Sequence, residues 1–211
     1  MSLSEKQRLE LNAPLPTSAI KERKGGGTKA LSYVEGWWVI DRLNAILGAG
    51  SWSYDCDAHE VYRACLNHPE KGERWHVTYV TKCKLWYPGE LATPIGDHGV
   101  GHGVDRDLGL AIESALKESN TDAVKRCAKS LGRHLGLALY DKAREHVVDD
   151  SLHLKLLELP DKDALHAFLK EARGRIREET DRATTEPWVR ECAARVGADV
   201  EKAVAYVWPA A

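Results

Sequence analysis

A run of basic side chains, uninterrupted by any acidic residue, lies between positions 125 and 133 of this 211-residue chain. It consists of Lys125, Arg126, Lys129 and Arg133. At 3.6 residues per turn, Arg126, Lys129 and Arg133 share a narrow sector of a helix with Asp122, and Lys125 lies at its edge. Such a face can bind a polyanion by replacing its counterions. A solvated helix face whose cations complement the helix dipole explains the same run, so the rest of the chain must decide.

Two glycine patterns could indicate a nucleotide site. The run Gly99, Gly101, Gly103 lacks both the third glycine and the acidic partner of a dinucleotide-binding fingerprint. Residues 25–29 have the composition of a phosphate loop without its glycine-lysine-serine/threonine ending. We therefore predict no nucleotide cofactor.

Histidines and carboxylates near the start of the long helical pattern could bind a metal. His98 and His102 have i, i+4 spacing, but the intervening glycines argue against a helix there. A carboxylate site of the nuclease kind could be built from Asp105, Asp107, Glu113 and Glu118. Acidic residues at these spacings are also typical of a soluble helix start. We predict no metal and keep a metal-dependent nuclease as an alternative.

Composition restricts the class of protein. With 43% hydrophobic residues the chain can form a core, and its length suits one main domain plus an appendage. The net charge is -2: residues 1–145 carry 20 basic and 19 acidic side chains, and residues 146–211 carry 10 and 13. Any polyanion site must therefore depend on local clustering, which recurs at residues 21–29.

Cysteine usage and hydropathy indicate the compartment. The chain has an odd number of cysteines with no CxxC pair, namely Cys56, Cys65, Cys83, Cys127 and Cys192. It shows neither a signal peptide nor an apolar run of membrane-spanning length. We expect a reduced, intracellular environment and no membrane partner.

Helical patterns surround the central part of the chain. Ser4 and Gln7 have capping-box spacing for a short helix that ends before Pro14. Residues 33–47 form an amphipathic helical pattern, and Gly48 is a natural stop.

Between positions 52 and 101 the hydrophobic period changes to two, which predicts an antiparallel meander. The predicted strands are 52–56, 58–66, 74–87 and one near 93–101, with a hairpin turn at 69–72. The long helix then packs across one face of the sheet. Lys82 and Lys84, on the polar face of the longest strand, are additional polyanion-binding candidates from charge alone.

The chain after Tyr140 becomes charged and helical. We predict helices at 161–182 and 187–207, with Pro187 in a first helical turn. The prediction is therefore an α+β fold, an antiparallel β-meander with a long helix packed across it and a helical C-terminal appendage. We place the domains at 1–145 and 146–211.

The motifs, taken in order, resemble a known family. Residues 33–40 read YVEGWWVI, and after the meander come Glu113-x-Ala115-x-Lys117-Glu118, Thr121-Asp122, Lys125-Arg126, Leu131-Gly132 and Leu139-x-Asp141-Lys142. Over residues 6–142 this order resembles the Rad52 family of single-strand annealing proteins. Size and the acidic tail are most similar to its bacterial branch, DNA damage response protein A (DdrA).

The resemblance implies a β-β-β-α domain that assembles into a homo-oligomeric ring. It implies single-stranded DNA binding in a groove without nucleotide hydrolysis, with strand ends protected and annealing possible, in break repair and recombination. It also implies a bacterial, cytoplasmic, nucleoid-associated protein that is not an enzyme. The C-terminal tail, which lies outside the resemblance, is a candidate for recruiting repair proteins.

Individual positions follow from matching the motifs. The basic floor of the family's groove matches Lys125, Arg126 and Lys129, and an aromatic groove position matches Tyr33. Glu22 falls at the spacing of a groove arginine, so Arg23 or Lys24 is expected to replace it.

Lys142 matches an outer DNA-contacting lysine. The tryptophans Trp37, Trp38, Trp52, Trp75 and Trp86 are assigned to the core or a subunit interface.

Two other classes of protein remain open. A nuclease would need the carboxylates after Gly99 to hold a metal, and it would degrade DNA in the presence of magnesium. A scaffold would assemble without DNA affinity and recruit a repair partner through the tail.

Overall fold

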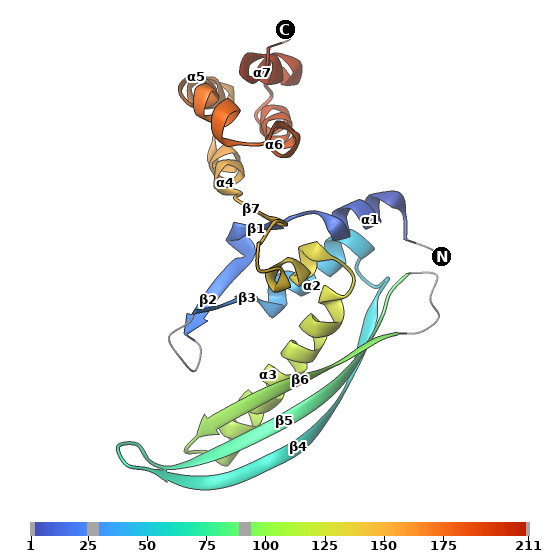
Figure 1. The fold of residues 1–211 in the computed structure, drawn as a ribbon, viewed down its shortest axis with the longest axis vertical. Helices are drawn as coiled ribbons and strands as arrows, with labels where there is room; N and C mark the ends of the chain where they lie inside the picture. The colour runs from blue at the N-terminus through green and yellow to red at the C-terminus, as the bar shows by residue number, and fades with distance from the viewer. Residues whose placement is uncertain (1–2, 25–29, 89–93, 210–211) are drawn as a thin grey trace. The chain divides into compact units, whose positions relative to one another are not determined.

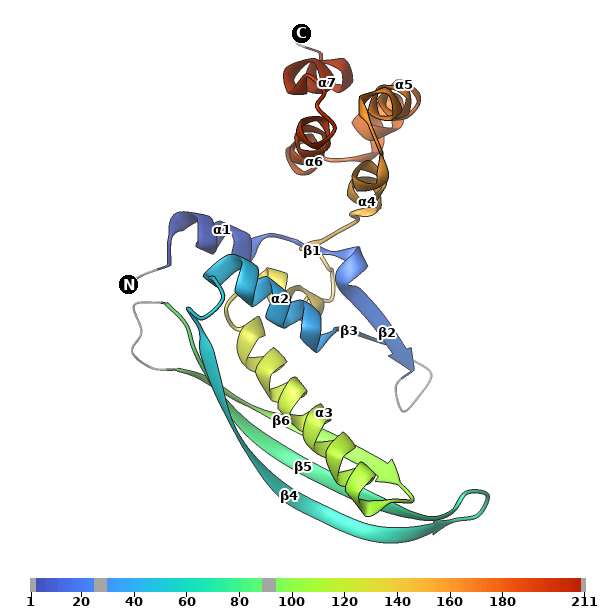
Figure 2. The same ribbon diagram turned by 180° about the vertical axis from the view of Figure 1, so that it is seen from behind.

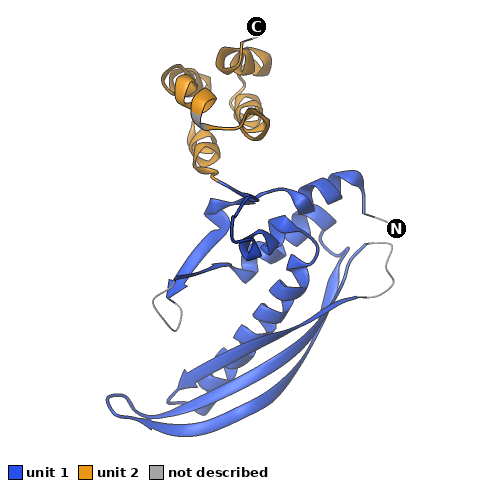
Figure 3. Cartoon of the chain, in the orientation of Figure 1, with its two compact units in different colours: residues 1–148 blue, residues 149–211 orange. Residues whose placement is uncertain are grey.

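The computed structural model describes residues 3–24, 30–88 and 94–209, so the glycine-rich segment 25–29 and position 93, where the last strand was predicted to start, lie outside the described residues. The chain divides into two compact units, Met1–Val148 and Asp149–Ala211 (Figure 3). No helix in the described part of the chain is long and apolar enough to cross a membrane.

The first unit is built on a three-stranded antiparallel sheet in the order β4-β5-β6. The strands are β4 (Ser53–His68), β5 (Gly72–Trp86) and β6 (Ile95–Asp105), and helix α3 (Leu108–Lys129) crosses one face of the sheet. Figures 1 and 2 show the helix lying along the curved sheet, over β5 and β6 rather than β4. The predicted meander-plus-helix fold is confirmed.

The strand boundaries differ from the prediction in two places. The segments 52–56 and 58–66 form one strand, because Asp57 pairs with Lys82 inside the ladder instead of turning the chain. A register shift between Glu60 and Tyr62 adds a β-bulge, which changes the phase of the side-chain alternation. Strand β6 runs on to Asp105, beyond the predicted end at Gly101.

The glycine run belongs to helix–sheet packing. A Cβ at Gly99 would overlap the backbone of Ala123, and one at Gly101 would overlap the carbonyl oxygen of Ala115. Gly103 meets the backbone of α3 in the same way. The alternate glycines therefore let the helix backbone lie directly on β6.

Two carboxylates of α3 reach past this contact to the free edge of β6. Glu118 Oε2 accepts a hydrogen bond from His102 N at 2.8 Å. Asp122 Oδ2 accepts one from Val100 N at 3.3 Å. These bonds satisfy backbone donors that an edge strand otherwise leaves open.

Helix α3 has defined ends. Asp107 caps its start by accepting from Leu110 N at 2.9 Å. The helix ends at Lys129, and short 3₁₀ turns follow at η2 (Arg133–Leu135) and η3 (Leu137–Tyr140). The prediction that Arg133 continues the cationic helix sector is therefore wrong, because the extended backbone of Gly132 interrupts the helix before it.

The N-terminal segments cover the C-terminal end of α3. Helix α1 (Glu5–Asn12) has the predicted Ser4–Gln7 capping box. A short strand β1 (Leu15–Pro16) pairs in parallel with β7 (Val147–Val148), with the 3₁₀ turn η1 (Thr17–Ala19) after β1.

The hairpin strands β2 (Ile20–Lys24) and β3 (Ala30–Val34) precede helix α2 (Gly36–Leu47). The prediction that the helix begins at Tyr33 is wrong. Tyr33 and Val34 pair with β2, and Glu35 remains extended as the N-cap residue.

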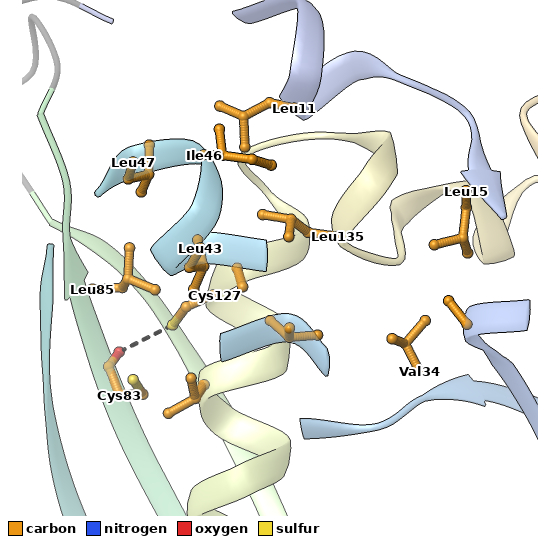
Figure 4. Close-up of a cluster of buried hydrophobic side chains, with 14 of the residues drawn as sticks. Leu11, Leu15, Val34, Leu43, Ile46, Leu47, Cys83, Leu85, Cys127 and Leu135 are labelled. Atoms are coloured by element: carbon orange, nitrogen blue, oxygen red, sulfur yellow. Dashed lines mark hydrogen bonds between the residues drawn. The ribbon is translucent and has the colours of Figure 1, made fainter. Parts of the chain in front are cut away.

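A buried apolar cluster joins these elements (Figure 4). Leu11, Leu15, Leu43, Leu85 and Leu135 are at most 2% exposed. The Cys127 thiol donates to the Cys83 carbonyl oxygen at 3.6 Å. Burial raises the pKa of the Cys83 and Cys127 thiols, so both stay protonated as small apolar groups.

Over its described residues, the second unit consists of four helices with their own core. They are α4 (Ser151–Glu158), α5 (Lys162–Glu179), α6 (Arg182–Arg195) and α7 (Val200–Val207). Their buried side chains include Leu156, Leu165, Leu169, Val189 and Val207.

The predicted pair of C-terminal helices is wrong in number. The segment 187–207 breaks at Gly197, which has φ 70°, and Asp199 then caps α7. Pro187 lies inside α6, because Asp181 caps that helix earlier than predicted by accepting from Thr184 N.

Candidate nucleic-acid interface

A cleft of about 280 Å³ opens where the C-terminal turns of α3 face β3 and η3. We call it the basic cleft, and its principal lining residues are Tyr33, Asp122, Lys125, Arg126, Lys129 and Tyr140. Three cations predicted from the spacing on α3 thus lie in one hollow with the predicted aromatic residue. Strand β3 supplies Tyr33, so it reaches the cleft from an extended segment instead of a helix.

Two cations approach the ring of Tyr33. Lys125 Nζ lies 5.7 Å from the ring centroid, and Arg23 Cζ lies 5.8 Å from it. Arg23 Nη1 is also 3.7 Å from Glu118 Oε1. A cation–π contact at an exposed site contributes about 0.5–1 kcal/mol, which is enough to orient the Lys125 and Arg23 side chains over the ring.

Lys129 forms the second cation–aromatic pair of the cleft. Its Nζ lies 4.2 Å from the ring centroid of Tyr140 and donates to Tyr140 Oη at 3.2 Å. Tyr140 is 65% exposed, so its ring is open to a ligand. Sequence reasoning missed Tyr140, although it occupies the unspecified position of the Leu139-x-Asp141-Lys142 motif.

Arg126 differs from the two lysines. Its Nε donates to the carbonyl oxygen of His98 at 2.7 Å, and Asp97 and Asp122 each lie 3.8 Å away. Its charge is therefore partly compensated, and the side chain ties α3 to β6. Among the described residues, no carboxylate forms an ion pair with Lys125 or Lys129, so these lysines supply the free positive charge.

The hairpin separates the two candidates for the groove arginine. Lys21 and Arg23 lie on the face of the hairpin that carries Tyr33, since Lys21 is the cross-strand partner of Tyr33. Lys24 lies on the opposite face. Arg23 therefore approaches the ring of Tyr33, a cleft residue, although neither Arg23 nor Lys24 is among the described lining residues.

Four other predicted residues do not line the cleft. Arg133 lies past the end of α3, and Lys142 is exposed in the turn before β7. Lys82 and Lys84 point away from α3, since the alternate residues Thr81 and Cys83 are buried beneath the helix. Across the sheet they pair with Asp57 and Asp55, respectively.

A hydrogen bond between Arg144 and a residue of the cleft wall could not be predicted from the sequence. Arg144 has φ 54°, and its Nη2 donates to Ser32 Oγ at 2.6 Å. Ser32 lines the basic cleft. The left-handed backbone of a non-glycine residue depends on tertiary contacts, which a sequence pattern does not reveal.

The carboxylates of the nuclease alternative have other partners. Asp105 accepts from Asp107 N, and Asp107 caps α3. Glu113 pairs with Lys117, whereas Glu118 binds β6 and Arg23. Within the described ranges no group of three or more His, Cys, Asp or Glu side chains is arranged to hold a metal.

The first unit combines a sheet-and-helix fold with a cleft in which two lysines lie beside two tyrosine rings, an arrangement typical of polyanion-binding sites. Comparison with known families makes the assignment specific. The profile of the Rad52/22 family double-strand break repair proteins matches residues 4–153, and the chain belongs to this family.

Similarity to individual proteins covers the same region. The chain is 30% identical over 142 residues to the DNA repair and recombination protein RAD52 of Saccharomyces cerevisiae, covering 66% of this chain and 28% of that protein. It is 31% identical over 137 residues to RAD52 of Kluyveromyces lactis, covering 63% and 29%. With the DNA repair and recombination protein rti1 of Schizosaccharomyces pombe it shares 30% over 142 residues, covering 67% and 37%. The matched region thus spans about a third of these relatives.

Proposed function

We propose that the chain binds single-stranded DNA in the basic cleft, without ATP, during the repair and recombination of broken DNA. The observation that carries the proposal is the convergence of Lys125 and Lys129, free of ion pairs within the described chain, with the rings of Tyr33 and Tyr140. Lysines neutralise phosphates without reading sequence, and exposed aromatic rings stack on unpaired bases. The combination favours a single strand over a duplex, whose bases are already stacked.

The test measures binding of labelled single-stranded and duplex DNA over a salt series, without nucleotide or metal. We expect preferential single-strand binding in the wild type. In the Lys125→Ala/Lys129→Ala variant we expect weaker binding and a salt slope reduced by about 0.7 for each phosphate that the lysines no longer neutralise.

The control is Lys117→Ala, an exposed lysine on the same helix outside the cleft, which is expected to bind like the wild type. The Lys82→Ala/Lys84→Ala variant measures separately the contribution of the other face of the sheet. Wild-type affinity in the Lys125→Ala/Lys129→Ala variant would contradict the assignment of the cleft.

The proposal extends to assembly and biological role. We propose a homo-oligomeric ring that protects strand ends and anneals complementary strands, in a bacterial protein of the DdrA branch. The acidic composition of the second unit supports a role in recruiting a repair protein. Light scattering and electron microscopy test the ring, and a pairing assay with complementary strands tests annealing.

A further inference from the structure

A second hollow adjoins the basic cleft. It has a volume of about 330 Å³ and lies between the start of α2, β4 and α3. We call it the Trp37 pocket, and its principal lining residues are Trp37, Ile40, Tyr54, Cys56, Asn120 and Lys125. Lys125 lines both hollows, so a ligand bound in the cleft passes the mouth of the pocket.

Two exposed aromatic rings form the walls of the Trp37 pocket. Trp37 is 65% exposed, so this unit does not bury it in the core, and Tyr54 is 49% exposed. Trp37 Nε1 donates to Glu35 Oε2 at 2.9 Å. The ring of Tyr54 stacks on Trp52 with centroids 5.9 Å apart and planes inclined by 22°.

A residue of helix α2 holds the ring of Trp52, on which Tyr54 stacks. Trp52 Nε1 donates to Asn44 Oδ1 at 2.9 Å, which fixes the ring that Tyr54 stacks on. Rings held in place before binding lose little conformational freedom when a planar ligand stacks on them. The pocket is therefore preorganised for a flat group.

The polar groups of the pocket favour a neutral ligand. Lys125 is the single charged residue among its described lining, and the Glu35 carboxylate beside Trp37 disfavours a phosphate. Burial raises the pKa of the Cys56 thiol, which therefore stays neutral. Asn120 Oδ1 accepts from Thr81 Oγ1 at 2.9 Å, and its amide nitrogen has no partner in the described part of the chain. That nitrogen can donate to a ring nitrogen or carbonyl oxygen.

We infer that the Trp37 pocket receives a base of the bound strand, stacked on Trp37 while Lys125 holds the adjoining phosphate. The inference rests on the proposed function, because the basic cleft must first bind the strand. It adds a base-contacting subsite to a site otherwise defined by backbone contacts. Stacking of this kind tolerates any base, since every base has a π-face.

The experiment compares an ordinary single strand with a strand of equal length made of abasic deoxyribose phosphates. Trp37→Ala is expected to weaken binding of the ordinary strand about 5- to 100-fold. Binding of the abasic strand and the salt slope should not change, because the lysines that neutralise the phosphates remain in place. Trp37→Phe should restore most of the affinity, and Trp86→Ala on the other face of the sheet is the matched control.

Each other outcome overturns the subsite. If Trp37→Ala binds the ordinary strand like the wild type, the pocket takes no base, although the cleft proposal stands. If it weakens both strands equally and changes the assembled size, the pocket is a contact between copies of the chain. If the wild type binds no single strand, the proposed function fails and the subsite fails with it.

A measurement on the wild type avoids dependence on a variant's folding. A strand carrying 5-iododeoxyuridine is irradiated in the complex, and the cross-linked peptides are identified by mass spectrometry. We expect cross-links at Trp37 or Tyr54. Cross-links confined to other peptides would contradict the inference.

Discussion

Arg126 and its neighbouring lysines lie on one surface but differ in how much they contribute to folding stability. The Arg126 guanidinium bonds to the carbonyl of His98, whereas Lys125 and Lys129 approach exposed tyrosine side chains. A hydrogen bond from a charged donor to the backbone of another element contributes to folding, and an exposed lysine beside a tyrosine contributes little.

We therefore predict that Arg126→Ala lowers the free energy of unfolding by about 1–2 kcal/mol. Lys125→Ala and Lys129→Ala should stay within about 0.5 kcal/mol of the wild type, as surface substitutions usually do. Urea unfolding followed by circular dichroism measures all three. Equal stability of Arg126→Ala and Lys125→Ala would show that the bond to His98 is unimportant.

The environment of His134 makes folding stability depend on pH. Burial lowers its pKa below the ordinary value, with a further contribution from Arg42, while its hydrogen bond to the Pro14 carbonyl at 3.0 Å acts in the opposite direction. The unfolded chain takes up a proton as the pH falls through about 6.5, and the folded protein resists it. The stability contribution is therefore complete above about pH 6.5 and is lost as the pH falls toward the folded pKa.

The variant His134→Asn keeps a side-chain amide for Pro14 and removes the titration. We expect its urea midpoint to fall less than that of the wild type between about pH 7.5 and pH 5.5. Parallel loss in both proteins would assign the acid sensitivity to other groups.

At this scale the sequence predicted the cations better than the aromatic contacts. Lys125, Arg126 and Lys129 follow from helical spacing, which depends only on neighbouring residues. The exposure of Trp37 and Tyr140 depends on which elements of the fold cover them. Residue type alone suggests that an aromatic side chain is buried.

Among the elements, β6 and α3 depend on each other most closely. A side chain at Gly101 would occupy the space of the Ala115 carbonyl. We predict that Gly101→Ala lowers the free energy of unfolding by about 3 kcal/mol, because backbone atoms cannot move aside as a flexible side chain does.

Gly96→Ala is the control on the same strand. Its Cβ would lie 3.7 Å from the Cys83 carbonyl oxygen, an ordinary contact distance. We expect it to unfold within about 0.5 kcal/mol of the wild type. If the two variants unfold alike, helix–strand proximity does not explain the glycine run.

The elements also show where periodicity is a sufficient guide. It predicted α3, β5 and their order, since long regular patterns average out local exceptions. It failed at Tyr33, where an apolar residue suited both a strand and the following helix. It failed again at Asp57, because a polar residue inside a ladder looks like a turn.

For the whole chain, the separate cores of the two units predict separate folding. A chain ending at Val148 keeps every residue of the basic cleft and of the Trp37 pocket. We expect it to fold and to bind single-stranded DNA like the full chain. The complementary piece, 149–211, should be helical and unfold cooperatively, because its four helices enclose their own apolar cluster.

Circular dichroism and the DNA-binding assay test these expectations. Loss of DNA affinity in the shorter chain, despite normal folding, would show that the helical unit takes part in binding. The change in composition after Tyr140 predicted a division at 145/146, and the compact units of the structure divide after Val148.

The carboxylates on β6 have a consequence for how sheets could join. A strand arriving at β6 must displace Glu118 and Asp122 from His102 N and Val100 N. At β4, no described side chain accepts a hydrogen bond from a backbone N–H of the strand. Edge-to-edge backbone pairing between sheets is therefore open at β4 and obstructed at β6. The endless ribbon from which fibrils grow is interrupted at every β6.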